Sequence, residues 1–141
     1  DRHGEIQPHE LHRLRELMQQ ALDDEALLKE WFGVRITEAK HDMDVAPVEP
    51  EYSEEEVQNL LEQGELALKV TGLRSVWFTG DSQTCYIDGE AWNLPAADSA
   101  AISLLCDQDE ISRDDLSELA DQAGFISLLT RLVNRGYWFF D

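Results

Sequence analysis

The sequence predicts an α+β fold that is mostly helical, with a small antiparallel sheet set among its C-terminal helices. Apolar residues recur at helical spacing near both ends, short β-prone runs lie between them, and a proline-containing stretch separates two regions. With 141 residues, 43% of them hydrophobic, the chain can form one core and an appendage. We therefore divide it into residues 1–38, 39–52 and 53–141.

Residues 1–38 have the pattern of a helical hairpin. Apolar side chains recur at spacings of three and four up to the pair Asp23-Asp24, which ends one helix and can cap the next. Two amphipathic helices cannot cover both of their apolar stripes, so we expect a dimerisation region here. The expected interface of the homodimer comprises Leu11, Leu14, Met18, Leu27 and Trp31.

Residues 39–52 predict an extended linker. Pro47 and Pro50 each fix their own backbone torsion and disfavour helix at the preceding residue. The next domain opens at Ser53, which is followed three residues later by Glu56. This capping-box spacing predicts a helix that stops at Gly64.

Residues 53–141 continue with β-prone runs over 66–70, 75–79, 84–87 and 90–94, and Asp88-Gly89 predicts a hairpin between the last two. Helices are expected from about 97, from Ser112 and from about 121–124, with the acidic residues 107–110 interpreted as a solvated turn. The aromatic residues 137–140 predict a terminal strand. Three helices with a helix-turn-helix-like pair beside a small sheet indicate a winged-helix-like domain.

The charge is strongly negative and unevenly distributed. Thirty acidic and 11 basic residues give a net charge of -19, and no Lys or Arg occurs between His41 and Leu68. Such a surface repels phosphate backbones and favours encounter with a basic protein, so we expect no nucleic acid partner. A solvated acidic face that only improves solubility, or adaptation to salt, is the alternative.

Few residue patterns point to chemistry. Cys85 and Cys106 are expected to be buried, reduced thiols. His3-Gly4-Glu5 matches half of an iron-binding triad, and His9 and His12 share a helix at the wrong spacing for zinc. We predict no catalytic, cofactor-binding or metal-binding residue. The tryptophans and terminal aromatics could form a ligand cage or peptide groove, although core packing is the commoner role.

No run of apolar residues is long enough to cross a membrane and no signal-peptide pattern is present, so we expect a cytoplasmic protein without a membrane partner.

Five strings in the sequence together carry a family resemblance. They are Gly4-Glu5-Ile6-Gln7-Pro8, Trp31-Phe32-Gly33, Pro47-Val48-Glu49-Pro50, Asp88-Gly89-Glu90 and Leu132-Val133-Asn134-Arg135-Gly136-Tyr137-Trp138-Phe139-Phe140. Through them the chain resembles the C-terminal portion of bacterial JmjC/cupin-type ribosomal oxygenases, the ribosomal protein arginine hydroxylases.

The resemblance implies a parent protein with an N-terminal jelly-roll oxygenase domain that uses Fe(II) and 2-oxoglutarate, followed by dimerisation helices and a winged helix. The oxygenase domain has no counterpart in this sequence, so no catalytic residue is transferred. The function expected is a non-catalytic dimerisation and partner-binding module, with a basic large-subunit ribosomal protein as the partner. The alternatives are a winged-helix regulator that binds nucleic acid and a stand-alone acidic adaptor.

Overall fold

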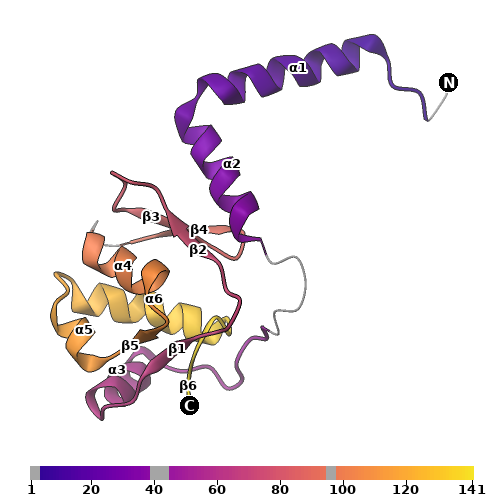
Figure 1. The fold of residues 1–141 in the computed structure, drawn as a ribbon. Helices are drawn as coiled ribbons and strands as arrows, with labels where there is room; N and C mark the ends of the chain where they lie inside the picture. Colours follow the sequence, from indigo (N-terminus) through magenta and orange to yellow (C-terminus); the bar gives the residue numbers. More distant parts are fainter. Residues whose placement is uncertain (1–3, 39–44, 95–97) are drawn as a thin grey trace. The chain divides into compact units, whose positions relative to one another are not determined.

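The computed structural model describes residues 4–38, 45–94 and 98–141 (Figure 1). The helices are α1 (Pro8–Asp23), α2 (Glu25–Thr37), α3 (Glu54–Glu62), α4 (Ser99–Asp107), α5 (Arg113–Ser117) and α6 (Gln122–Asn134). The strands are β1 (Ala67–Lys69), β2 (Ser75–Trp77), β3 (Thr84–Ile87), β4 (Glu90–Asn93), β5 (Glu110–Ile111) and β6 (Trp138–Phe140). Among the described residues, no helix combines the length and apolar content that a membrane crossing requires.

The chain divides into two compact units, residues 1–32 and residues 33–141. The first unit contains α1 and most of α2, which are separated by the single residue Asp24. A capping box between Gln7 and Glu10 begins α1, and the Asp24 side chain accepts hydrogen bonds from the first turn of α2. These caps fix the helix ends without any buried side chain in α1.

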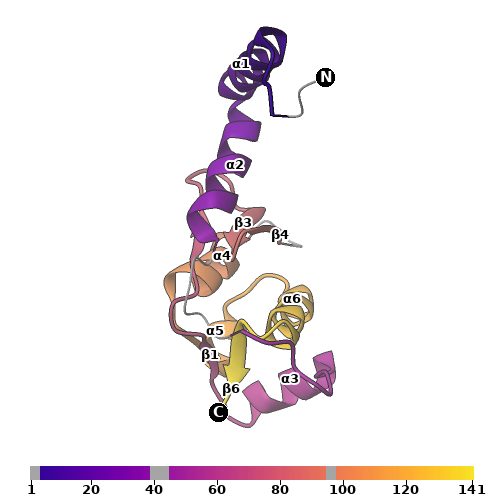
Figure 2. The ribbon, with the colours of Figure 1, turned by 90° about the vertical axis from the view of Figure 1, so that its right-hand side faces the viewer.

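The second unit contains two three-stranded antiparallel sheets within the described residues. One has the order β5-β1-β6 and the other β2-β3-β4. In the first, Ala67 of β1 lies opposite Ile111 and Phe140, so the middle strand of this sheet comes first in the chain. Helix α6 packs against both α3 and β6 (Figure 2). The helix-turn-helix-like pair is therefore α5 and α6, placed beside the β5-β1-β6 sheet.

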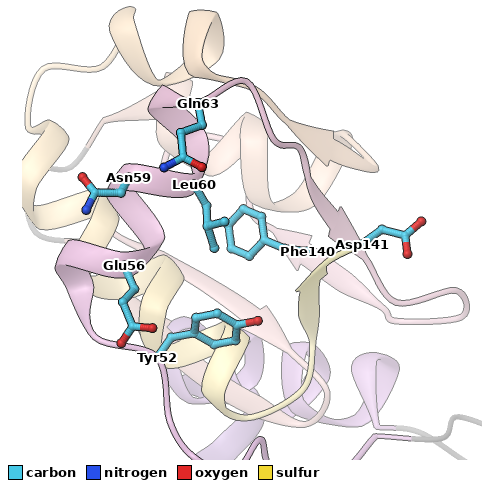
Figure 3. Close-up of a pocket in the computed structure, with 7 residues that line it drawn as sticks. All are labelled: Tyr52, Glu56, Asn59, Leu60, Gln63, Phe140 and Asp141. Carbon is cyan, nitrogen blue, oxygen red and sulfur yellow. The ribbon is translucent and has the colours of Figure 1, made fainter.

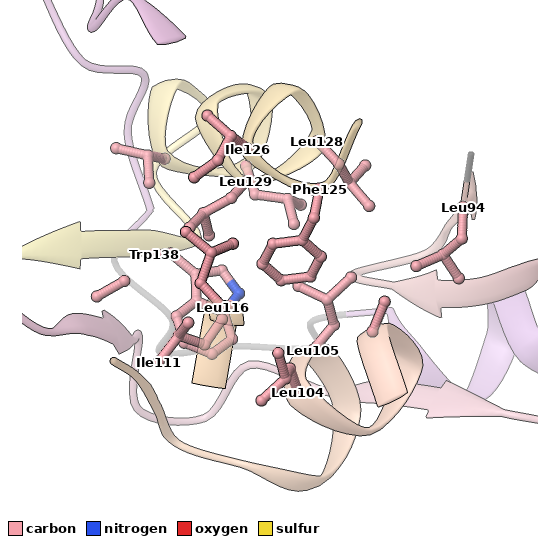
Figure 4. Close-up of a cluster of buried hydrophobic side chains, with 14 of the residues drawn as sticks. Leu94, Leu104, Leu105, Ile111, Leu116, Phe125, Ile126, Leu128, Leu129 and Trp138 are labelled. Atoms are coloured by element: carbon pink, nitrogen blue, oxygen red, sulfur yellow. The ribbon is translucent and has the colours of Figure 1, made fainter. Parts of the chain in front are cut away.

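The core of the second unit is built around α6. Its buried face includes Phe125, Leu129 and Leu132, which are at most 2% exposed. Figure 4 shows Phe125, Leu105 of α4 and Trp138 of β6 directed toward one another. Contacts of this kind join helices and strands that are far apart in sequence, so α4, α6 and β6 are expected to fold as one cooperative unit.

The end of α2 belongs to the second unit and packs against the β3–β4 hairpin. A Cβ atom at Gly33 would lie 2.5 Å from the ring of Tyr86, so only glycine allows this approach. The buried hydroxyl of Thr37 donates to the Gly33 carbonyl at 2.8 Å and accepts from the Gly89 N–H at 2.8 Å. Asp88 and Gly89 both have positive φ, as the hairpin predicted from this pair requires.

The structure differs from the sequence prediction in the sheets. One small sheet was expected, whereas the strands form two, because β1 pairs with β5 and β6 and not with the β2–β4 hairpins. The interpretation of residues 107–110 as a solvated turn is wrong at its end, where Glu110 begins β5. Of the expected linker, residues 39–44 lie outside the described residues, and residues 45–52 contain no helix or strand.

Candidate interaction surfaces

The first candidate site is the apolar surface of α1 and the first part of α2. The five residues predicted for the dimer interface are all exposed, between 49% and 58% of each side chain. Further large apolar side chains of the same helices, which the predicted interface did not include, are also exposed. We call the whole set the N-terminal apolar surface: Leu11, Leu14, Leu17, Met18, Leu22, Leu27, Leu28, Trp31 and Phe32.

The helix geometry gathers part of this surface into one stripe. Leu11, Leu14, Met18 and Leu22 follow one another at spacings of three or four residues, which places them on one face of α1. A 16-residue helix with no buried residue is marginal in water by itself. The stripe is therefore an apolar surface that would be stabilised by burial, and the described part of the first unit does not bury it.

Charge distinguishes this surface from the rest of the chain. Residues 1–40 contain nine acidic and six basic residues, a net charge of -3, whereas residues 41–141 contain 21 acidic and five basic residues, a net charge of -16. Like charges repel when two copies approach. The N-terminal unit is the part of the molecule where a second copy meets the least repulsion.

The second candidate surface is acidic and lies at the start of the winged-helix unit. Residues 45–68 contain seven acidic side chains and no Lys or Arg. Three of the acids, Glu54, Glu55 and Glu56, form the first turn of α3, where the helix dipole stabilises negative charge. Ser53 and Glu56 complete the predicted capping box, with Ser53 accepting from Glu56 N at 3.1 Å.

The cations of the helix-turn-helix-like pair are engaged within the unit. The guanidinium carbon of Arg131 lies 4.9 Å from the centroid of the Trp92 ring, and that of Arg135 lies 5.6 Å from it. Arg135 also donates to both carboxylate oxygens of Glu90, at 2.6 and 3.3 Å. This hydrogen-bonded pair raises the pKa of Arg135. Arg131 of α6 and its C-cap residue Arg135 are the cations that a nucleic acid could contact here, and both already contact protein groups.

A cavity of about 420 Å³ opens between α3 and β6 (Figure 3). Tyr52, Leu60 and Phe140 are half-buried and form its apolar walls, and the two rings have centroids 6.2 Å apart. The acidic residues Glu56 and Asp141 and the amide residues Asn59 and Gln63 complete the lining, and Figure 3 shows the Asp141 carboxylate pointing away from Leu60 and Phe140. The terminal aromatics thus have two roles, since Trp138 is fully buried while Phe140 lines the cavity.

The two cysteine thiols are hydrogen-bonded to each other, and Lys69 Nζ donates to the carbonyl of Cys106 at 3.4 Å. Cys85 is buried as expected, but Cys106 is only half-buried. A hydrogen bond with Cys85 and then burial raise the pKa of the Cys106 thiol, which disfavours the reactive thiolate. Lys69 lies over Trp138, with Nζ 5.3 Å from the ring centroid, and burial lowers its pKa.

Among the described residues, no group of three or more His, Cys, Asp or Glu side chains could hold a metal ion. His12 contacts Glu16, with Nε2 3.0 Å from Oε1. His3, part of the half-triad in the sequence, lies outside the described residues.

Comparison with known proteins assigns the family. The family model of the ROXA-like winged helix matches residues 16–139. The chain belongs to the ROXA-like winged-helix family. This confirms the α+β winged-helix prediction and the resemblance to ribosomal oxygenases. The match includes Met18, Leu27 and Trp31 of the N-terminal apolar surface and begins after Leu11 and Leu14.

Relatives of this ROXA-like winged helix are longer proteins. The chain is 33% identical over 138 residues to the ribosomal protein uL16 3-hydroxylase of Escherichia coli K12, covering 98% of the chain and 36% of the relative. A crystal structure of the Escherichia coli ribosomal oxygenase YcfD matches with a TM-score of 0.78 and 30% identity, over 100% of the chain and 38% of YcfD. A complex of YcfD with cobalt and 2-oxoglutarate matches with a TM-score of 0.77 and 30% identity, over 99% of the chain and 37% of YcfD.

Proposed function

We propose that this ROXA-like winged helix is the non-catalytic dimerisation and partner-binding module of an Fe(II)/2-oxoglutarate-dependent ribosomal protein hydroxylase that acts in the cytoplasm. The observation that carries the proposal is the N-terminal apolar surface, in a chain similar to ribosomal oxygenases over almost all of its own length. The chain spans 36% of the hydroxylase relative, so the catalytic step is assigned to a part of the parent outside this sequence.

The N-terminal apolar surface is assigned to a second copy of the same chain. A stable interface buries about 800 Å² on each partner, and nine large apolar residues that are 38% to 63% exposed supply an area of that order. In a twofold dimer the same patch serves both subunits, so one apolar surface is sufficient. The small local charge of residues 1–40 supports the same choice of partner.

The cofactors follow from the relatives. YcfD has been crystallised with cobalt and 2-oxoglutarate, and we propose Fe(II) and 2-oxoglutarate for the parent hydroxylase. The described residues offer no cluster of three metal ligands, and we assign neither group to this chain. Its contribution to catalysis is positional: it pairs two subunits and holds the substrate protein near them.

The proposed substrate partner is a basic large-subunit ribosomal protein. The relative is named for ribosomal protein uL16, and the net charge of -16 on residues 41–141 complements a basic protein. Association through such surface charges weakens as salt rises, because the Debye length falls from about 10 Å at 0.1 M to about 3 Å at 1 M. We expect binding of purified uL16 to weaken with salt, and salt-independent binding counts against the acidic surface.

Dimerisation is tested by introducing negative charge into the stripe. Leu14→Asp together with Met18→Asp places four carboxylates in the twofold interface and should convert the dimer to a monomer in light scattering. The matched control is His9→Asp with Gln20→Asp, which adds the same charge to the opposite face of α1 and should leave the dimer intact. A wild-type chain that stays monomeric at high concentration contradicts the proposal.

One observation favours a nucleic acid regulator, namely the helix-turn-helix-like pair of α5 and α6. Against it, Arg131 and Arg135 contact Trp92, and the acidic surface repels phosphates. A gel-shift titration with random duplex DNA distinguishes the two functions. Binding that weakens steeply with salt would support the regulator, whereas no shift agrees with a protein-binding module.

A further inference from the structure

We propose that the cavity between α3 and β6 is a docking site for an arginine side chain of the basic partner protein (Figure 3). The proposal rests on the proposed function, because it names the place where that partner is held. The occupant is a guanidinium group that is bound and released unchanged.

The shape of the cavity suits a long, flat side chain. Its volume of about 420 Å³ lies within the range of about 300–1,000 Å³ that is typical of ligand pockets. Figure 3 shows the rings of Tyr52 and Phe140 pointing into the space beside Leu60. A guanidinium stacks on aromatic faces within about 6 Å of the ring centroid, and the alkyl stem of arginine packs on apolar walls such as Leu60.

The charge of the lining selects a cation. Glu56 and Asp141 make the lining acidic, and the lining contains no Lys or Arg. Asn59 and Gln63 each offer an amide oxygen that can accept a further N–H. Arginine carries five N–H donors in a fixed planar arrangement, which matches several acceptors around one cavity better than the compact ammonium of lysine.

The walls of the cavity are fixed before any partner arrives. The Tyr52 backbone is held from both sides by one side chain of α6: Tyr52 N donates to Asn134 Oδ1 at 2.8 Å, and Asn134 Nδ2 donates to Tyr52 O at 3.0 Å. Phe140 is paired with Ala67 in the β5-β1-β6 sheet. Glu56 is held in the capping box of α3, where it accepts from Ser53 N at 3.2 Å. A preformed site loses less entropy on binding.

The test uses the full chain and three short probes in an NMR titration: acetyl-Gly-Arg-Gly-amide, its citrulline counterpart, which is neutral and nearly isosteric, and its lysine counterpart. The arginine probe should produce saturable shifts at Tyr52, Leu60 and Phe140. The citrulline probe should bind roughly tenfold more weakly, because it lacks the positive charge that the exposed acidic residues of the lining attract, and the lysine probe should also bind more weakly.

Two double variants test whether the arginine probe binds at the cavity. Glu56→Gln with Asp141→Asn neutralises the two acidic side chains among the lining residues and keeps the cap of α3, because glutamine still presents an oxygen to Ser53 N. We expect the arginine probe to bind about tenfold more weakly to it. The control, Glu54→Gln with Glu55→Gln, removes the same charge from the same turn of α3 outside the cavity and should change binding by less than about twofold.

Several results would overturn the assignment: citrulline or lysine binding as well as arginine, equal weakening in the control variant, or no saturable shift at the cavity. The dimer and the binding of purified uL16 are measured on the same proteins. A cavity variant that loses the arginine probe but binds uL16 unchanged refutes the docking role and leaves the proposed function intact. A wild-type chain that binds the arginine probe but neither dimerises nor binds uL16 refutes the proposed function and leaves the cavity assignment intact.

Discussion

Helix α6 buries seven of its 13 residues, whereas α1 buries none of its 16. Both helices have apolar residues at the three- and four-residue spacing that marks one helix face. For α6 the cover comes from α3, α4 and β6 within the same unit. For α1 the described residues of the first unit supply only end caps. The spacing of apolar residues therefore identifies the helix face that must be buried, but it does not show whether the same chain or another molecule buries it.

The largest effect should come from truncating the buried helix. Leu129→Ala removes a side chain with no exposed surface and should lower the free energy of unfolding by about 2–5 kcal/mol at any protein concentration. Leu14→Ala, on α1, should cost no more than about 0.5 kcal/mol in dilute, monomeric protein and more as the concentration rises and the dimer forms. Urea unfolding at two protein concentrations measures both. A large loss of unfolding free energy for Leu14→Ala in the monomer would show that α1 is already packed within a single chain.

The next effect concerns α2, which combines both kinds of environment, because Trp31 is exposed and Gly33 is buried. Gly33→Ala places a Cβ against the Tyr86 ring, which is itself buried, and should destabilise the winged-helix unit by about 1–3 kcal/mol. Gly4→Ala is the control, because nothing lies within 4 Å of its added Cβ. Thermal unfolding by circular dichroism compares the two. Equal melting temperatures would show that the end of α2 is not packed in solution.

A smaller effect should follow from the hydroxyl of Thr37. Thr37→Val keeps the shape of the side chain but leaves Gly89 N–H without its acceptor at the hairpin turn, at a cost of about 1–2 kcal/mol. Thr37→Ser retains the hydroxyl and should recover most of the loss, which separates the hydrogen bond from packing. Amide hydrogen exchange at Gly89 is the direct readout. Unchanged protection in Thr37→Val would mean that this contact does not fasten α2 to the hairpin.

Local signals in the sequence predicted much of the fold. The Ser53 and Glu56 capping box, the Asp88-Gly89 hairpin and the strand at the aromatic C-terminal run all form as expected. Each depends on neighbouring residues, which a single sequence displays. Strand β5 was missed because its two residues become a strand only by pairing with Ala67 and Leu68, some forty positions earlier. Such long-range pairing leaves no short-range pattern.

The candidate surfaces also divide into features that local sequence predicted and features that depend on long-range contacts. The exposure of the five predicted interface residues could be inferred from the apolar spacing on α1 and α2, whereas their contact with a second copy stays a prediction. The cavity could not be located from sequence, because Tyr52 and Phe140 are separated by most of the second unit and meet only through β6 and Asn134. The engagement of Arg131 and Arg135 by Trp92 was hidden for the same reason, since β4 and α6 are distant in the chain.

The smallest expected effect appears only in alkaline solution and belongs to the winged-helix unit, which contains all three tyrosines, Tyr52, Tyr86 and Tyr137. Burial, followed by a hydrogen bond with Asp88, raises the pKa of Tyr137 above its ordinary value of 10.0. The native state therefore favours the protonated phenol. The resulting stabilisation is complete below that ordinary pKa and is lost as the pH rises through the raised one.

Lys69 acts in the opposite direction, because its lowered pKa makes stability increase as the pH approaches 10.5. Comparing the wild-type chain with Tyr137→Phe removes this contribution, since both proteins keep Lys69. The difference in their free energies of unfolding should be constant up to about pH 10 and should narrow above it, where the wild-type phenol ionises. Urea titrations at a series of pH values measure that difference. If the two stability curves stay parallel into the alkaline range, the Tyr137 phenol is neither buried nor held by Asp88 in solution, and the packing around the end of α6 is looser than the structure indicates.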